Sequence, residues 1–239
     1  MNNKYSSIYD YFVEEIENKQ INAGSKLPSE HNIMEMFNTS RETVRKALSL
    51  LAQNGYIQKI RGKGSVVLER NKFNFPISGL VSFKELSIKM GRKWETEVHN
   101  LDIVEADSFL QMNIQCKEKE QIWAVNRTRS VDGEKIILDK DFFLKTHVEK
   151  LTKEICEVSI YEYLEEKLQL QISFAKKEVT IEEITDEDKF LLDLKGLTHI
   201  VVVKNYVYLE DATLFQYTES RHRLDKFKFV DFARRVKGS

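Results

Sequence analysis

The chain has 239 residues, of which 41% are hydrophobic and 31% are charged, and its net charge is −1. This composition is typical of a folded chain of one large or two modest domains, and it excludes a disordered or fibrous protein. No apolar run reaches membrane-spanning length, no signal peptide is visible, and the distant Cys116 and Cys156 match no metal motif, so we expect a cytoplasmic protein with reduced thiols.

The small net charge conceals a basic segment. Between residues 39 and 70, seven cations stand against Glu42 and Glu69, which gives a local charge of +5. The cations are Arg41, Arg45, Lys46, Lys59, Arg61, Lys63 and Arg70. Attraction to phosphates depends on such a local patch and not on the charge of the whole chain. Nucleic acid is therefore a possible partner.

Two helices are predicted before residue 38. The first has apolar residues at helical spacing and should end near Gly24, a residue type common just after helices. Its apolar stripe consists of Ile8, Tyr9, Phe12 and Ile16. The second helix should begin after Ser29, which can cap its N-terminus. Its expected buried stripe is Ile33, Met36 and Phe37.

A third helix should follow the turn at residues 38–39, with Ser40 as its N-cap. Its expected inner face consists of Val44, Ala47, Leu48 and Leu51. Arg41 and Arg45 are four residues apart and share a different face of the helix. A short helix, a tight turn and a helix with exposed arginines form a helix-turn-helix, whose second helix reads the major groove of DNA.

A basic hairpin is predicted after the third helix. Residues 56–60 and 65–68 have strand character on either side of Arg61-Gly62-Lys63-Gly64. The glycines permit a tight turn and close approach to a partner, and two cations at the tip suit phosphates or a minor groove. A helix face with arginines or a basic turn is by itself usually just solvated surface. Both together, in this order, predict a DNA-binding winged helix.

The pattern changes after residue 70. Residues 71–76 have neither helical nor alternating character, and Pro76 favours an extended approach. We therefore expect a DNA-binding domain over residues 1–70, a linker over 71–76 and a second domain over 77–239.

The second domain is predicted to be an antiparallel sheet with helices packed on it, so that the whole chain is of the α+β class. Strands are expected at residues 122–130, 136–143, 172–184, 200–208 and 213–222, and helices at 158–168 and 186–194. Thr185 should cap the last helix. Residues 223–229 could form a basic edge strand or a closure of the sheet.

Two arginines on one strand indicate an anion site. Arg127 and Arg129 are two residues apart, so both point to one face, where their like charges favour a phosphate. A three-residue loop at 131–133 would put Asp139 on that face, whereas a two-residue loop would put it on the other. A salt-bridge ladder on the surface remains the alternative.

A row of polar side chains alternates on the last predicted strand. The row consists of Gln216, Thr218, Ser220 and His222. Such a row could bind the hydroxyls of a sugar, or it could face solvent.

The N-terminal motifs resemble those of a known family. Leu27-Pro28-Ser29-Glu30, the pattern from Ser40 to Leu48, and Gly55-Tyr56-Ile57 through Gly62-Lys63-Gly64 resemble the winged-helix domain of GntR-type bacterial regulators. This resemblance implies operator contacts by His31, Ser40, Arg41, Glu42, Arg45, Arg61 and Gly62. Thr43, Lys46 and Lys63 complete the candidate DNA-binding set. Arg41 and Arg45 are the leading candidates for guanine or phosphate contacts, whereas His31 could equally be a surface residue.

Residues 76–236 resemble the effector domain of the HutC branch of that family, a UTRA domain with a chorismate-lyase-like fold. The matching motifs include Leu80 to Glu85, Arg127-x-Arg129, Asp132-Gly133, Ser159-Ile160-Tyr161 and Tyr217-Thr218-x-Ser220. In relatives that sense amino-sugar phosphates, the matching positions hold the phosphate. The resemblance therefore implies that a phosphate is held by Ser82, Phe83, Lys84, Arg127 and Arg129. It likewise implies that the sugar is surrounded by Asp139, Ser159, Tyr161, Gln216 and His222. Those relatives carry Glu at positions 139 and 216 and Tyr at 222, so the sugar end differs.

Within the family, the resemblance over nearly the whole chain narrows to the branch that regulates trehalose operons in Gram-positive bacteria. It is carried by residues 40–48, 51–68, 151–157 and 214–227. This implies trehalose 6-phosphate as the effector. One reading helix per chain offers too little surface for tight specific binding, so we also expect a homodimer on palindromic double-stranded DNA.

An enzyme is the rival class, because the second domain resembles a lyase fold. The sequence contains no nucleophile elbow, no histidine cluster and no phosphate-loop glycines. Fold similarity does not transfer activity. We therefore expect no catalytic residue, metal or cofactor. A passive architectural DNA binder, the third class, would leave the second domain without a role.

Overall fold

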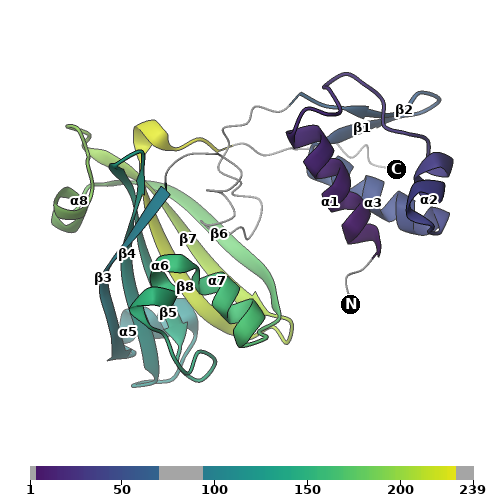
Figure 1. Ribbon diagram of the computed structural model, residues 1–239. Coiled ribbons are helices and arrows are strands. Elements are labelled where there is room, and N and C mark those ends of the chain that lie inside the picture. Colours follow the sequence, from purple (N-terminus) through teal and green to yellow (C-terminus); the bar gives the residue numbers. More distant parts are fainter. Residues whose placement is uncertain (1–3, 70–93, 230–239) are drawn as a thin grey trace, which may run out of the picture. The chain divides into compact units, whose positions relative to one another are not determined.

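The computed structural model of the chain describes residues 4–69 and 94–229, which fall into two units (Figure 1). The predicted linker at 71–76 and the candidate effector residues Ser82, Phe83 and Lys84 lie outside the described residues. Among the helices described, none is both long and apolar enough to cross a membrane. Both cysteines are free thiols, Cys156 buried and Cys116 half-buried.

The first unit is a winged-helix domain. Its helices are α1 (Lys4–Glu17), α2 (Glu30–Phe37) and α3 (Arg41–Gln53), and its hairpin consists of β1 (Ile57–Ile60) and β2 (Gly64–Val67). All predicted inner-face residues of α3 are buried, and they pack with Ile8 and Phe12 of α1 and with Ile33 of α2. The predicted helix-turn-helix and wing are thereby confirmed.

Local capping signals fix the ends of two of these helices. Ser29 caps α2 by accepting a hydrogen bond from the amide of Asn32 at 3.1 Å, and Ser40 caps α3 by accepting one from the amide of Thr43 at 3.3 Å. Both side chains bind amides that the first turn of a helix leaves without a partner. Both predicted caps are therefore confirmed.

Two expectations for this unit are wrong. α1 ends at Glu17, well before Gly24, because Lys19 adopts a φ of 58° and reverses the chain. Gly24 lies in a later turn, where its amide donates to the carbonyl of Val67 at 2.8 Å. In α2, Met36 is 54% exposed and Met34 packs against the core instead. A helix of two turns is too short for spacing alone to separate neighbouring faces.

The second unit is a six-stranded antiparallel sheet with the strand order β3-β4-β5-β8-β7-β6. The strands are β3 (Trp94–Glu105), β4 (Gln121–Val131), β5 (Glu134–Leu144), β6 (Ile172–Glu183), β7 (His199–Leu209) and β8 (Leu214–Arg223). The antiparallel sheet is confirmed. β3 was not predicted, because a bulge between Val98 and Asn100 breaks the alternation of its side chains.

Helices cover both faces of this sheet. α6 (Lys153–Val158) and α7 (Ile160–Glu162) lie on one face of the sheet (Figure 1), where α6 contacts β3 and Tyr161 of α7 reaches Gln216 of β8. α7 continues into a π-helical turn, Tyr163–Lys167. Cys156, Ile160 and Leu164 pack there against strand residues. α8 (Asp186–Leu191) packs on the opposite face against Leu138 and Val202. α5 (Ser108–Ile114) follows β3.

The ends of three predicted elements need correction. The helix expected at 158–168 is interrupted at Ser159, whose extended backbone separates α6 from α7. α8 begins at its predicted cap Thr185 but ends at Leu191 instead of residue 194. Residues 223–229 form no edge strand: Arg223 is fully buried and pairs with Asp225 and Glu134, and a 3-10 turn, Leu224–Lys226, follows.

Candidate effector site and DNA-binding surface

A β-bulge brings the candidate anion-binding residues to one face of the sheet. The loop between β4 and β5 has only two residues, Asp132 and Gly133, both with positive φ. A loop of that length alone would have turned Asp139 to the other face. The pairing shifts by one residue just after the loop, and Arg127 stands directly opposite Asp139. The predicted common face is confirmed, but the three-residue loop invoked for it is wrong.

Both arginines are buried and ion-paired. The Nη2 atom of Arg127 lies 2.5 Å from Oδ2 of Asp141, and its Nη1 atom donates to the carbonyl of Cys156 at 3.0 Å. The Nε atom of Arg129 donates to Asp139 at 2.9 Å, and its Nη1 atom donates to the Thr96 hydroxyl at 2.5 Å. The arginines are only 5% and 6% exposed. A ladder on the solvated surface, the alternative from the sequence, is therefore wrong.

Burial and the neighbouring charges shift the pKa values of Arg129 and Asp139. Burial, together with the neighbouring charge of Arg127, lowers the pKa of Arg129 to about 10, although Asp139 opposes the shift. Burial raises the pKa of Asp139, but the charges of Arg129 and Arg127 outweigh it and hold the pKa below its ordinary value. Arg129 and Asp139 therefore both stay charged at neutral pH. Within the described residues, the buried Nε atom of Arg127 has no hydrogen-bond partner.

The polar row on β8 lies beside this pair. Ser220 donates to Asp139 at 2.5 Å, and Thr218 donates to Asp141 at 2.9 Å. The amide of Gln216 donates to Thr218 at 2.8 Å, and its carbonyl oxygen accepts from the Tyr161 hydroxyl at 2.9 Å. Gln216, Thr218 and Ser220 are thus connected to the arginines through Asp139 and Asp141, and Gln216 and Thr218 are buried. They supply hydroxyl and amide groups next to a cationic pair.

His222 and Tyr161 keep neutral side chains at this site. Burial lowers the pKa of His222 to about 4, although Asp139 opposes the shift. Burial, with the charge of Asp141, raises the pKa of Tyr161 well above its usual range. The imidazole stacks at a tilt on Phe227, with ring centres 5.2 Å apart. Neutral imidazole and phenol groups can exchange hydrogen bonds with hydroxyls.

The burial of His222 predicts a pH dependence of stability. Between pH 6.5 and about 4 the unfolded chain binds a proton at this position that the folded chain does not, so the free energy of unfolding falls as the pH falls. We expect His222→Gln to remove about 1–2 kcal/mol of this loss at pH 5. Urea denaturation of both proteins at pH 7 and pH 5 measures it. Equal losses in both proteins would contradict the prediction.

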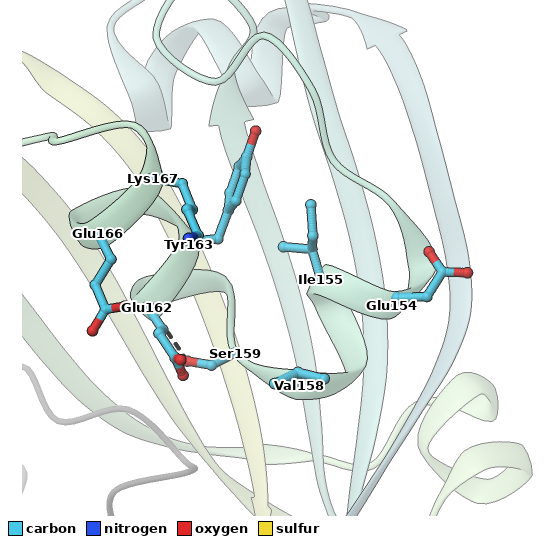
Figure 2. A pocket seen from close by; sticks show the side chains of 8 residues that line it. All are labelled: Glu154, Ile155, Val158, Ser159, Glu162, Tyr163, Glu166 and Lys167. Carbon is cyan, nitrogen blue, oxygen red and sulfur yellow. Dashed lines mark hydrogen bonds between the residues drawn. The ribbon is translucent and has the colours of Figure 1, made fainter.

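Ser159 lies at the junction of α6 and α7. Its hydroxyl accepts from the amide of Glu162 at 3.3 Å and caps α7. It lines a hollow of about 300 Å³ on the α6–α7 layer (Figure 2). The remaining lining residues are Glu154, Ile155, Val158, Glu162, Tyr163, Glu166 and Lys167. Three carboxylates against one ammonium group disfavour a phosphate, so this hollow is a poorer anion site than the arginine pair.

Two polar residues of the cluster, Asp141 and Thr96, were missed from the sequence, whereas Thr218 was predicted as part of the polar row on β8. Asp141 and Thr218 bind each other beneath the arginines, and Thr96 on β3 binds Arg129. Asp141 could have been found, because it is two residues from Asp139 and must share its face. Thr96 could not, because its strand was not recognised.

The DNA-binding candidates on α3 form an exposed surface. The side chains of Arg41 and Arg45 are 71% and 66% exposed, and both approach Glu30, whose carboxylate is 3.0 Å and 3.8 Å away. Glu42 is exposed as well. Flexible, solvated ion pairs of this kind contribute little to stability, so both arginines are available to a partner.

The other candidates occupy different settings. Arg61, Gly62 and Lys63 are exposed at the tip of the wing, where Gly62 has a φ of 77°. Lys46 lies over the Tyr5 ring at 4.5 Å. His31 is exposed and lies 3.3 Å from Glu35. Ser40 and Thr43 hydrogen-bond to each other at 2.9 Å at the start of α3.

A winged helix joined to a sheet domain with a buried polar cluster defines a transcription regulator with an effector domain. Comparisons with known proteins identify the family of this regulator. Residues 4–67 match the profile of the bacterial regulatory proteins of the gntR family, and residues 89–228 match that of the UTRA domain. The chain belongs to the GntR family of regulators that carry a UTRA domain. The families and relatives that it matches are transcription regulators and not enzymes.

Similar proteins span the whole chain. The regulator TreR of Bacillus subtilis is 58% identical over 98% of this chain and 99% of its own. The mannosyl-D-glycerate system repressor MngR of Escherichia coli is 29% identical over 97% of this chain and 96% of its own. The crystal structure of YydK from B. subtilis covers 97% of this chain and 99% of its own, with a TM-score of 0.79 and 26% identity.

One solved structure concerns the second unit alone. The effector-binding domain of the B. subtilis trehalose repressor is 57% identical and covers 60% of this chain and 99% of its own, with a TM-score of 0.56. The chain is therefore a transcription regulator of the trehalose repressor type.

Proposed function

We propose that this protein represses a sugar-uptake and catabolism operon from the bacterial cytoplasm, and that trehalose 6-phosphate releases it from its operator. The single observation that carries the proposal is the buried pair Arg127 and Arg129 beside a wall of hydroxyl and amide groups. The pair suits a phosphate, and the wall suits the hydroxyls of a sugar. The likeness to the trehalose repressor supplies the identity of the sugar.

The DNA-binding half of the proposal rests on the exposed basic surface of the first unit. Arg41 and Arg45 of α3 would enter the major groove, and Arg61 and Lys63 would contact the backbone or minor groove beside it. The chain would act as a homodimer on a palindromic operator, because one reading helix buries too little surface for specific binding. Effector binding would favour a dimer in which the two helices no longer match adjacent half-sites.

A titration of operator DNA tests the proposal. Fluorescence anisotropy of a labelled trehalose-operon fragment should show tight binding that trehalose 6-phosphate reverses. Trehalose, which lacks the phosphate, and glucosamine 6-phosphate, which carries a different sugar, should have little effect. Release by glucosamine 6-phosphate alone would assign an amino-sugar effector instead. Analytical ultracentrifugation that found a monomer both free and on DNA would contradict the dimer.

A further inference from the structure

Asp141 is the centre of the polar cluster, and both of its carboxylate oxygens are occupied. Oδ2 accepts from Arg127, and Oδ1 accepts from Thr218 at 2.9 Å and from Gln216 at 3.3 Å. Asp141 itself is 3% exposed. It therefore joins the guanidinium that suits a phosphate to the β8 residues that suit a sugar.

The arginine pair carries no net excess of positive charge. Arg127 faces Asp141 and Arg129 faces Asp139, so the four buried groups sum to a formal charge of zero. The Nη1 atom of Arg127 also donates to the Cys156 carbonyl, so both terminal nitrogens of this guanidinium already have partners. An anion that reaches this guanidinium must compete with the carboxylate of Asp141, and it must approach that carboxylate's own negative charge.

We propose that Asp141 determines the specificity of the site, rejecting a bare tetrahedral anion and accepting a phosphate that is attached to a hydroxyl-bearing sugar. The inference rests on the proposed function. A phosphate that takes Arg127 leaves Oδ2 of Asp141 buried without its donor, which is costly. A sugar hydroxyl can donate to that oxygen and restore the hydrogen bond, whereas a bare dianion only adds repulsion.

Binding of sulfate and of trehalose 6-phosphate to the full chain separates these effects. Sulfate is a tetrahedral dianion without a hydrogen to donate. Isothermal titration of the wild type should give tight binding of trehalose 6-phosphate and weak binding of sulfate. Asp141→Asn removes the competing charge at nearly constant volume. It should strengthen sulfate binding by about tenfold or more, because one nearby unit charge shifts such equilibria by that factor. It should weaken binding of trehalose 6-phosphate.

Asp188→Asn is the matched control. Asp188 is equally buried and pairs with Arg221 through two hydrogen bonds of 2.7 Å and 2.8 Å, but on the opposite face of the sheet. It should lower the melting temperature and leave both affinities unchanged. If Asp141→Asn fails to fold, Asp141→Ser, which keeps a short hydroxyl partner for Arg127, serves in its place.

The possible outcomes are distinct. If Asp141→Asn weakened the binding of both ligands to the same extent, Asp141 would have only a structural role. If it left sulfate binding unchanged, Asp141 would not belong to the site. Either result overturns the inference. A wild type that does not bind trehalose 6-phosphate contradicts the proposed function instead. The sulfate result still reports on Asp141 in that case, because sulfate needs no sugar.

Discussion

Arg127→Ala is expected to give a repressor that binds its operator normally and no longer responds to trehalose 6-phosphate. The guanidinium is buried beside Arg129, where a charge-assisted hydrogen bond to a phosphate is strong. Removal of a buried charged partner typically costs 2–5 kcal/mol, so we expect the effector concentration needed for release to rise by about 100-fold or more. Anisotropy of labelled operator DNA during effector titration measures this concentration.

The same substitution has a structural cost that must be separated from its effect on the ligand. Without Arg127, the carboxylate of Asp141 stays buried with only Thr218 and Gln216 as donors. Breaking a buried pair on one side destabilises a protein by about 3–5 kcal/mol. The double variant Arg127→Ala, Asp141→Asn removes both charges and should recover much of this stability. It should also remain unresponsive, whereas normal induction in either folded variant would exclude Arg127 from the phosphate site.

Features that depend on a few neighbouring residues could be predicted from the sequence. Ser29, Ser40 and Thr185 cap their helices as expected, since a cap involves only a side chain and an amide three residues away. The helix-turn-helix and the wing were recognisable for the same reason. Local chemistry also predicted the glycine turns at the tip of the wing.

Features set by contacts across the sheet could not be predicted in the same way. The β4–β5 bulge reconciles a two-residue loop with the packing of both faces of the sheet. No residue type near Arg129 signals it in the sequence. The break at Ser159 likewise falls inside a continuous helical pattern. The predicted common face of Arg127 and Asp139 is right although its stated cause is wrong, so a correct site residue does not validate the geometry that suggested it.

The sequence also could not show that the arginines are paired. The spacing of Arg127 and Arg129 indicates two cations on one face, and this alone predicts a strongly positive site. Asp139 and Asp141 cancel that charge in the folded chain. Selectivity among anions must then come from the exchange of hydrogen-bond partners and not from net electrostatic attraction. This conclusion depends on the ion pairs between neighbouring strands, which the sequence does not show.

Arg45→Ala is expected to reduce operator affinity and to erase most of the preference for operator over unrelated DNA. Arg45 lies in the second turn of α3, exposed and only loosely paired with Glu30 at 3.8 Å, so it can turn to a base edge at little cost. A bidentate contact between arginine and guanine contributes about 1–3 kcal/mol of discrimination. In a homodimer the loss occurs in both half-sites, so we expect a reduction of about 100-fold or more.

Binding to a scrambled duplex separates base reading by Arg45 from simple phosphate attraction. Lys63→Ala at the tip of the wing is the matched control, since it removes one exposed cation from the same domain. Loss of a lysine that contacts only phosphate should weaken binding to both duplexes by the same factor. Because a homodimer loses one such lysine from each subunit, the slope of log affinity against log salt should fall by about two. Arg45→Ala should weaken the operator far more than the scrambled duplex. If it weakened both equally, Arg45 would be a backbone contact, and base reading would have to be assigned to another residue of α3, with Arg41 the next to test.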